Sequence, residues 1–375
     1  MTIRIFNPEH DIALASGLAN FTAPHAGRQL RHDLGFLPAA WAAAGDVIVA
    51  DDPELAQRLW QRMAHRIATL WCGGETAHGG LKFVSWKQLA TIGSDAVVEP
   101  WGWDSALCAM LLRHGIEASQ LPSTAELQTV RELSHRRVAA ALLPALRIAG
   151  TAGEAFECRT ADEVDALLKQ YGHIVIKAPW SSSGRGLRFF DASHPNNREQ
   201  IKNEKGWLHH VIESQGSVMV EPYYNKVKDF GMEFFSDGKG TVSYLGLSLF
   251  HTANGAYTGN ILATETVKRE MISRYVPEDL LDEAQAKVCI ELGEMFNGKY
   301  RGPFGIDMMA CAPTVLNSNE IMKNEKCLLH PCVEINLRRT MGHVAIALTP
   351  KDDDIRCVMR IGYSENNYKL TIDRL

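Results

Sequence analysis

Short apolar runs alternate with helical patterns through the first 125 residues of the chain. Residues 3–6 and 46–50 are apolar runs bounded by turn residues, whereas residues 53–67 and 105–114 carry apolar side chains at helical spacing. Strands that alternate with helices in this way predict a parallel, doubly wound sheet. We therefore expect residues 1–125 to form an α/β lobe.

Two loops of this lobe follow predicted strands and carry polar or aromatic side chains. His10 and Asp11 follow the first strand, and Trp103 lies just before residues 105–114. Ligands of doubly wound sheets bind beyond the carboxyl ends of the strands, so these three residues are candidates for an acceptor-substrate pocket. The alternative is that Pro8 and Glu9 open a helix and that the tryptophans pack against a neighbouring lobe.

A second unit follows, with a helical run over 124–146, a strand over 155–158 and a helix that begins after Thr160. Thr160 and Glu163 have the spacing of a capping box, and Gly172 is expected to end that helix. An apolar strand over 173–177 then leads directly into a turn rich in serine and glycine. This turn is the most informative short segment of the chain.

The remaining chain is dominated by strand patterns, at 218–221, 230–236, 240–250, 305–310 and 331–336, with one long helical pattern at 277–296. Such a mixture predicts an α+β lobe built mainly on antiparallel strands. The sequence as a whole thus predicts three lobes of mixed α/β and α+β class, comprising residues 1–125, 126–215 and 216–375.

Composition narrows the class of protein. The 375 residues include 39 Lys and Arg against 44 Asp and Glu, for a net charge of −5, and 46% are hydrophobic. This balance is that of a globular chain without a broad basic surface, so we expect no nucleic-acid partner. No apolar stretch is long enough to span a membrane, and the eight cysteines include no CxxC pair, which predicts a cytoplasmic protein with reduced thiols and no membrane partner.

The serine- and glycine-rich turn has the chemistry of a phosphate cradle. Lys177 ends the apolar strand and supplies a positive charge, and small residues let backbone N–H groups approach phosphate oxygens. The order of residues differs from a Walker A loop, because the lysine precedes the glycines. A flexible connection is the alternative reading of the turn. The serine- and glycine-rich turn consists of Ser181, Ser182, Ser183, Gly184, Arg185 and Gly186.

Two later strands carry carboxylates within apolar sequence. Asp307 lies in one of them, and Glu334, Asn336 and Arg338 share one face of the other because alternate strand residues point the same way. Burying an ionised carboxylate is costly unless it pairs or binds a cation. Two carboxylates and an amide oxygen suit Mg²⁺, with phosphates and water completing its shell, whereas buried ion pairs with the arginines are the alternative.

A proline-broken strand near residue 220 could read a nucleotide base. Pro222 ends the pairing of the strand, which frees backbone groups for an adenine edge, and Asp229 could accept from ribose hydroxyls. Taken alone, the segment is more typical of an interdomain hinge.

The order and spacing of these pieces resemble the ATP-grasp superfamily over roughly residues 134–342. The resemblance implies an ATP-grasp fold with an N-terminal Rossmann-like pre-ATP-grasp domain, and a phosphate-binding role for Arg136, or its neighbour Arg137, and for Lys177. It implies that the serine–glycine turn is a flap over the phosphates, that Asp229 binds ribose, and that Asp307, Glu334 and Asn336 bind Mg²⁺, with Mn²⁺ as an alternative. The matching positions around adenine are Glu221, Pro222, Tyr223 and Tyr224.

The same resemblance implies the activity. We expect an ADP-forming carboxylate–amine ligase that makes an acylphosphate, acts on an amino acid or peptide-like small molecule and forms a homodimer. Lys177, Arg136 and Arg338 are the expected catalytic cations. The expected substrate residues are Arg301, Arg339, His10, Asp11, Trp103 and His251, the last within a polar segment at 248–260. A small-molecule kinase and a non-catalytic ATP-binding module are the competing classes.

Overall fold

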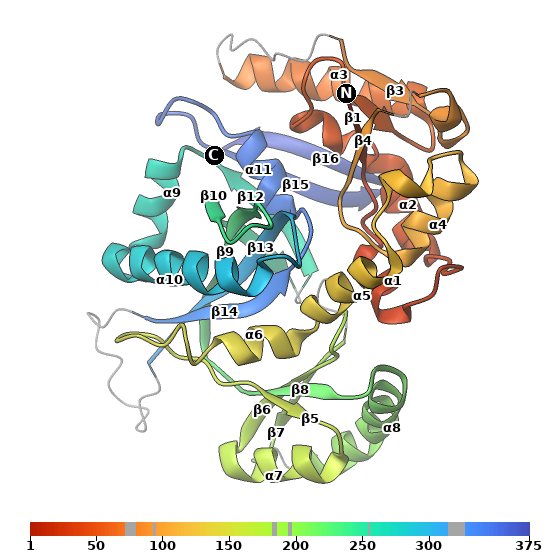
Figure 1. Ribbon diagram of the computed structural model, residues 1–375. Coiled ribbons are helices and arrows are strands. Elements are labelled where there is room, and N and C mark those ends of the chain that lie inside the picture. The colour runs from red at the N-terminus through yellow and green to blue at the C-terminus, as the bar shows by residue number, and fades with distance from the viewer. Residues whose placement is uncertain (72–79, 93–94, 182–185, 194–196, 254–255, 314–326) are drawn as a thin grey trace.

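The computed structural model describes residues 1–71, 80–92, 95–181, 186–193, 197–253, 256–313 and 327–375 (Figure 1). Over these residues the strands form four four-stranded sheets, one of them wholly parallel. The expectation of a mixed α/β and α+β fold is therefore confirmed. Among the described helices, none is both long and apolar enough to cross a bilayer.

The N-terminal lobe is built on the parallel sheet, in the order β3-β2-β1-β4. Its strands are β1 (Thr2–Ile5), β2 (Val47–Val49), β3 (Lys82–Val84) and β4 (Val97–Pro100), and its helices are α1 (His10–Ser16), α2 (His25–Leu34), η1 (Leu37–Ala40), α3 (Pro53–Leu70), η2 (Trp86–Thr91), α4 (Ser105–Arg113) and η3 (Ala118–Gln120). Strand β1 pairs with both β2 and β4, so the loops that follow β1 and β4 emerge side by side. This sheet confirms the predicted parallel arrangement.

The central lobe is an antiparallel sheet in the order β5-β8-β6-β7. Its elements are β5 (Phe156–Cys158), α7 (Ala161–Tyr171), β6 (His173–Lys177), β7 (Leu187–Asp191), α8 (Asn197–Gln215) and β8 (Val218–Pro222). The capping box of Thr160 and Glu163 and the C-cap Gly172 are present as expected. Because β8 belongs to this sheet, the chain leaves the lobe after Pro222, later than the boundary at 215/216 that the sequence suggested.

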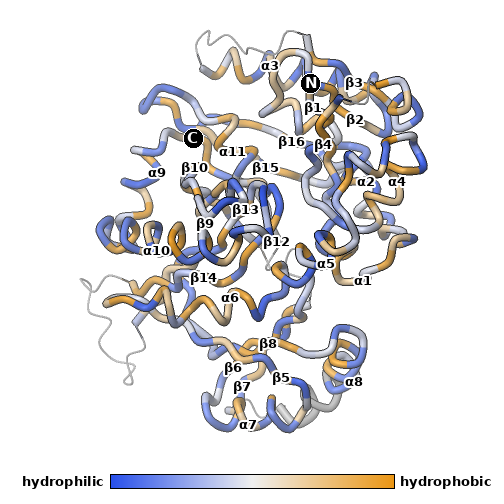
Figure 2. Tube along the Cα trace, viewed as in Figure 1, coloured by the Kyte–Doolittle hydropathy of each residue, from blue (hydrophilic) through white to orange (hydrophobic). Residues whose placement is uncertain are grey.

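The C-terminal lobe carries the antiparallel sheet β10-β9-β13-β14. The strands are β9 (Lys226–Ser236), β10 (Val242–Ser248), β13 (Gly302–Cys311) and β14 (Leu328–Asn336), and the helices are α9 (Glu265–Ile272), α10 (Glu278–Phe296) and α11 (Met341–Ala347). Hydrophobic and hydrophilic residues alternate along the turns of α10 (Figure 2), and the apolar ones enter the same core as Phe234 and Phe304 of the sheet. Helices α5 (Thr124–Leu133) and α6 (Arg136–Leu142) also contribute to this core. A single helical run was expected at 124–146. Two helices form instead, because α5 ends at its C-cap Ser134 and the extended residue His135 caps the start of α6.

A fourth sheet, β11-β12-β15-β16, links the C-terminal lobe to the N-terminal lobe. Its strands are β11 (Phe250–Ala253), β12 (Ala256–Leu262), β15 (Cys357–Ser364) and β16 (Asn367–Arg374). One hydrophobic core joins Trp60 and Trp101 of the first lobe to Leu262, Met359 and Ile372 of this sheet. The central lobe, by contrast, has a hydrophobic core of its own. In Figure 1 it lies below the other two lobes, and α6 runs between it and β14.

Candidate functional site

Charged side chains from several elements meet where the central lobe faces the end of sheet β10-β9-β13-β14. Lys177 ends β6, Arg136 begins α6, and Asp307 and Glu334 lie opposite each other on β13 and β14. A small cavity between the lobes is lined by Asp11, Leu14, Ser134, Pro179, Trp180, Ser181, Glu334, Ile335, Asn336 and Leu337. We call this cavity, together with the charged side chains around it, the cleft. It contains residues of all three lobes.

Lys177 is buried and paired within the central lobe. Its Nζ lies 2.6 Å from Glu221 Oε1, and both side chains are less than a tenth exposed. The pair spans neighbouring strands, since β6 lies beside β8. A buried ammonium that is paired with a carboxylate at the cleft can transfer its contacts to an anionic ligand.

Arg136 connects the serine- and glycine-rich turn to strand β14, which carries the predicted metal ligands Glu334 and Asn336. Its Nη1 donates to Ala178 O and to Ser181 Oγ, and its Nη2 donates to Glu334 Oε1 at 2.6 Å. Burial disfavours its positive charge, but Glu334 raises the pKa of Arg136 above the ordinary arginine value. Arg136 is therefore a fixed cation between the turn and the carboxylates.

The predicted metal ligands lie on one face of the antiparallel sheet. Asp307 is in register with Glu334, and Gly305 is in register with Asn336. Alternation along the strands places all four positions on the same face. A Cβ at Gly305 would come within 2.5 Å of Glu233 Oε2, so this glycine makes room for a further carboxylate beside the ligand set.

Asp307 lies among groups that oppose its ionisation. Burial, Glu334 and Glu233 together raise the pKa of Asp307 to about 8. A divalent cation there would remove this cost, because it favours the ionised carboxylate. Within the described residues, no group of three or more His, Cys, Asp or Glu side chains has metal-binding geometry. The set of two carboxylates and an amide therefore fits Mg²⁺ only if other ligands, such as phosphate oxygens, share the ion.

Arg338 lies on the same side of the cleft but is held by the N-terminal lobe. Its Nε donates to Asp11 Oδ1 at 2.7 Å and its Nη2 to Asp11 Oδ2 at 2.6 Å. Nη2 also donates to Asn336 Oδ1. Although burial raises it, the contacts with Arg338 hold the pKa of Asp11 below its usual range. Asp11 is consequently engaged by the protein itself.

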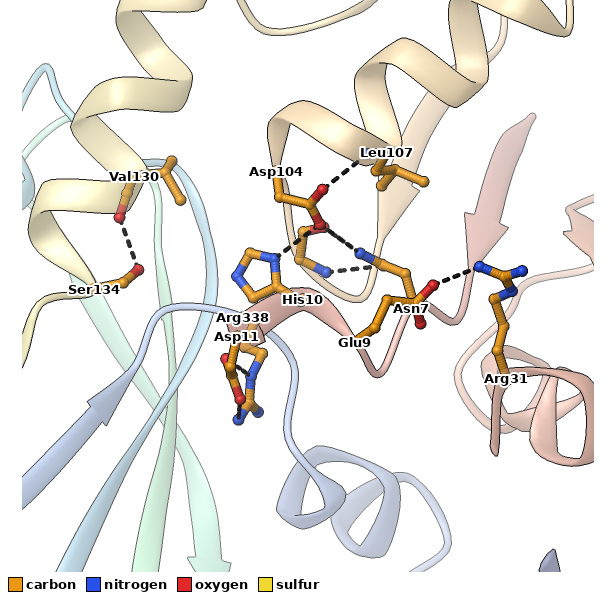
Figure 3. Close-up of polar contacts among 11 residues, drawn as sticks. Asn7, Glu9, His10, Asp11, Arg31, Asp104, Leu107, Val130, Ser134 and Arg338 are labelled. Atoms are coloured by element: carbon orange, nitrogen blue, oxygen red, sulfur yellow. Dashed lines mark hydrogen bonds and ion pairs between the residues drawn. The ribbon is translucent and has the colours of Figure 1, made fainter. Parts of the chain in front are cut away.

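The two loops of the N-terminal lobe meet as the parallel strands require (Figure 3). Asn7 donates to Gly102 O and to Asp104 Oδ2, and His10 Nδ1 lies 3.4 Å from the same Asp104 oxygen. His10 is almost fully buried, and its Nε2 has no hydrogen-bond partner in the described part of the chain. Trp103 is half-buried against the core of its own lobe, whereas the packing alternative had placed it against a neighbouring lobe.

The expected base-binding residues divide between two environments. The ring of Tyr224 packs edge-on against His330, with the ring centres 5.3 Å apart. Tyr223 instead stacks on His173 and is exposed, on the continuation of β8 beyond Pro222. Asp229 Oδ2 accepts from Lys226 and from Thr252. Tyr224 and His330 therefore pack together near Glu221, whereas Tyr223 faces outward.

The structure describes the two ends of the serine- and glycine-rich turn, Ser181 and Gly186. Ser181 is at the cleft, and Gly186 has a φ of 79°, a left-handed conformation that favours glycine. Gly186 O accepts from Ala178 N, which closes the base of the turn. The four residues Ser182, Ser183, Gly184 and Arg185 lie outside the described residues.

Four predicted residues are directed elsewhere. Arg137 is half-exposed and lies 3.7 Å from Glu157, so Arg136 is the member of the pair that reaches the cleft. Arg301 precedes β13, at the end of the strand remote from Asp307, and lies over Phe235. Arg339 lies over the Trp41 ring, and burial lowers its pKa to about 10. His251 is exposed on β11.

Two residues of the site were missed in the sequence. Glu233 is buried on β9, and its charge adds to the raised pKa of Asp307. His330 is fully buried, and neither ring nitrogen has a hydrogen-bond partner among the described residues. Burial lowers the pKa of His330 to about 4, so the ring is neutral. Glu233 carried the same signal as Asp307, a carboxylate within an apolar strand, whereas nothing in the sequence marked His330.

No family model matches the chain, and no curated protein matches its sequence. Solved structures similar to it include N5-carboxyaminoimidazole synthetase from Staphylococcus aureus complexed with ADP, at 12% identity and a TM-score of 0.48 over 97% of this chain and 83% of the other. The biotin carboxylase domain of Hydrogenobacter thermophilus 2-oxoglutarate carboxylase, in complex with MgADP, has 14% identity and a TM-score of 0.49 over 85% and 75% of the two chains. Biotin carboxylase from Campylobacter jejuni has 14% identity to this chain and a TM-score of 0.48, over 96% of this chain and 75% of the other. These values describe a distant likeness and assign no activity to this chain.

Proposed function

We propose that this protein is an ATP- and Mg²⁺-dependent, ADP-forming ligase of the ATP-grasp type, which joins a small carboxylate to an amine. The observation that carries the proposal is the cleft itself. Arg136 is paired with Glu334, Lys177 is paired with Glu221, and the charges of Arg338 and Glu334 both act on Asp307. Transfer of a phosphoryl group needs charge neutralisation and positioning more than a protein nucleophile, and this residue set supplies both.

The ion pairs of the cleft have the composition of a nucleotide–metal site whose charges neutralise one another. Glu334 is held by Arg136 and Glu221 by Lys177. When MgATP binds, phosphate oxygens would take the contacts of the two cations, and Asp307, Glu334 and Asn336 would hold the metal. Bound Mg²⁺, or Mn²⁺, would supply charge neutralisation at the phosphates. Exchange of partners in this way leaves few buried charges unpaired.

Two chemical steps follow from the proposal. The substrate carboxylate attacks the γ-phosphorus of ATP, an O–P bond forms and ADP leaves with the electrons of the broken bond. The amine nitrogen then attacks the acyl carbon, a C–N bond forms, and inorganic phosphate leaves as the amine gives up a proton. Arg136 and Lys177 stabilise the charge that spreads over the transferred group. An amino acid or peptide-like compound is the substrate class we propose.

The test is turnover with defined substrate pools. The purified protein is incubated with ATP, Mg²⁺ and mixtures of amino acids and dipeptides, and ADP and phosphate are measured while products are identified by mass spectrometry. A new amide, formed in step with ADP, supports the ligase. A stable phosphate ester would instead identify a kinase, and normal ATP binding without turnover over a wide metabolite library would favour the non-catalytic module.

A further inference from the structure

The ion pair between Asp11 and Arg338 joins two lobes at the edge of the cleft. Asp11 lies in the first turn of α1, and Arg338 follows β14 two residues after Asn336. Both side chains are largely buried, and the two contacts are parallel, at 2.7 Å and 2.6 Å. A bidentate arginine–carboxylate pair of this geometry fixes the guanidinium in orientation as well as in position.

Counting the donors of Arg338 shows how completely it is held. A guanidinium has five N–H groups. Two of them donate to Asp11, one on Nη2 donates to Asn336 Oδ1, and one on Nη1 donates to Arg339 O. Among the described residues, the second N–H on Nη1 has no acceptor. While Asp11 keeps its hold, Arg338 can offer a ligand a single directed hydrogen bond and not a two-pronged clamp.

The two residues that precede Asp11, Glu9 and His10, are held at the start of α1 by other elements of the N-terminal lobe (Figure 3). Glu9 accepts from Arg31 at 2.5 Å, and Arg31 also donates to Asp51. On another side, His10 Nδ1 faces Asp104, whose second oxygen accepts from Leu107 N. Figure 3 shows Glu9 turned toward Arg31, with Asp11 and Arg338 facing the strands of the C-terminal lobe.

These anchors distinguish Asp11 from a surface carboxylate that happens to meet an arginine. A long arginine side chain has several rotatable bonds, and without a partner it would sample many rotamers at the cleft. Contacts from α2, from the loop after β4 and from α4 fix the helix that presents Asp11. The placement of Arg338 therefore depends on the N-terminal lobe.

We propose that Asp11 is a positioning residue of the cleft, which holds Arg338 so that its one remaining N–H meets the transferred phosphoryl group. The proposal rests on the function proposed above. It assigns to the N-terminal lobe a part in phosphoryl transfer, in addition to the acceptor-binding part suggested by its sequence. Asp11 acts through Arg338 and needs no contact with the substrate.

The test compares five variants with the wild-type protein: Asp11→Asn, Asp11→Glu, Arg338→Gln, the double variant Asp11→Asn with Arg338→Gln, and Asp373→Asn. The last is the matched control, because Asp373 also pairs across the lobes, with Arg66, at an exposed position away from the cleft. Two affinities and two kinetic constants are measured for each protein. Calorimetry gives the affinities for MgADP and for the magnesium complex of the non-hydrolysable ATP analogue AMPPNP, and steady-state ADP release with the active substrate pool gives kcat and KM for ATP.

We expect Asp11→Asn to lower kcat by about 10- to 100-fold, the usual cost of removing a partner that orients an active-site group, with little change in KM for ATP. The ratio of AMPPNP to ADP affinity should fall as it does in Arg338→Gln, because both changes affect the contact with the terminal phosphate. Asp11→Glu should retain more activity than Asp11→Asn. The double variant should be no worse than Arg338→Gln alone, since the two residues act as one unit.

Other outcomes overturn the inference. An Asp11→Asn protein that keeps the wild-type kcat and affinity ratio, while Arg338→Gln changes them, would show that the pair only joins the lobes. Equal losses in Asp11→Asn and the control Asp373→Asn would show the same. If the wild-type protein binds neither nucleotide, the proposed function fails and the inference fails with it, whereas binding without any effect of Asp11 removes the inference alone.

Discussion

At the scale of single residues, the adjacent arginines Arg136 and Arg137 lie in different environments. Arg136 is buried in the cleft and donates to the backbone of Ala178, to Ser181 and to Glu334, whereas Arg137 is half-exposed beside Glu157. The difference arises because α6 begins at Arg136, so successive side chains point about 100° apart around the helix axis. Sequence alone could not choose between them, since a one-residue shift of the helix start would exchange their positions.

This difference predicts a contrast between two matched variants. Arg136→Ala should weaken binding of MgATP at least about tenfold, because it removes a charge-assisted contact to phosphate and leaves the half-buried Glu334 without this partner. Arg137→Ala should bind as the wild-type protein does. Calorimetric titration measures both, and equal weakening in the two variants would contradict the placement of Arg136 in the nucleotide site.

At the scale of elements, the apolar strands and their polar ends could be predicted well. The strand at 173–177 is β6 residue for residue, and the capping box at Thr160 forms as expected. The pairing of Asp11 with Arg338 could not be predicted, because 327 residues separate them and only the docking of two lobes brings them together. His330 was missed for a similar reason, since its importance lies in burial without partners, which local pattern does not reveal.

The carboxylate of Asp46, which binds strand β1, predicts how the stability of the protein depends on pH. Asp46 accepts from Thr2 N, Ala43 N and Arg4 Nε. Burial opposes ionisation, yet these hydrogen bonds lower the pKa of Asp46 below its usual value. A lowered folded-state pKa stabilises the protein above the unfolded-state value of about 3.9, and that stabilisation is lost as pH falls through the folded-state pKa.

Asp46→Asn should therefore reduce the free energy of unfolding by about 1–3 kcal/mol at neutral pH, the range for disrupting a buried, charge-assisted hydrogen-bond set. The difference from the wild-type protein should shrink as the pH falls below about 4. Urea unfolding at a series of pH values measures it. A difference that stays constant down to pH 3 would show that the charge of Asp46 contributes nothing.

At the scale of the whole molecule, the hydrophobic cores do not follow the order of the lobes along the chain. The first lobe shares a core with the last sheet, so the two ends of the sequence are packed together. The central lobe has a separate core of residues between Cys158 and Val220. The sequence predicted three lobes, but it could not show this shared core, because side-chain packing between distant segments leaves no local pattern.

The division of cores predicts how the molecule opens. Amide hydrogens of β5, β6 and β8 should lose protection as one group in rising urea, while those of β1, β2, β15 and β16 lose protection together as another. Native-state hydrogen exchange followed by mass spectrometry distinguishes the groups. Simultaneous loss in all seven strands would contradict an independent central lobe.

The central claim, that the cleft is a metal-dependent nucleotide site, is tested most directly by calorimetric titration with ATP in the presence and absence of Mg²⁺. We predict one site per chain, with affinity that depends on Mg²⁺ and is reduced at least about tenfold by Glu334→Gln, since a metal ligand is lost. Glu157→Gln, a matched change at the arginine-paired carboxylate outside the cleft, should leave it intact. Binding that is the same with EDTA as with Mg²⁺, or unchanged in Glu334→Gln, would contradict the claim.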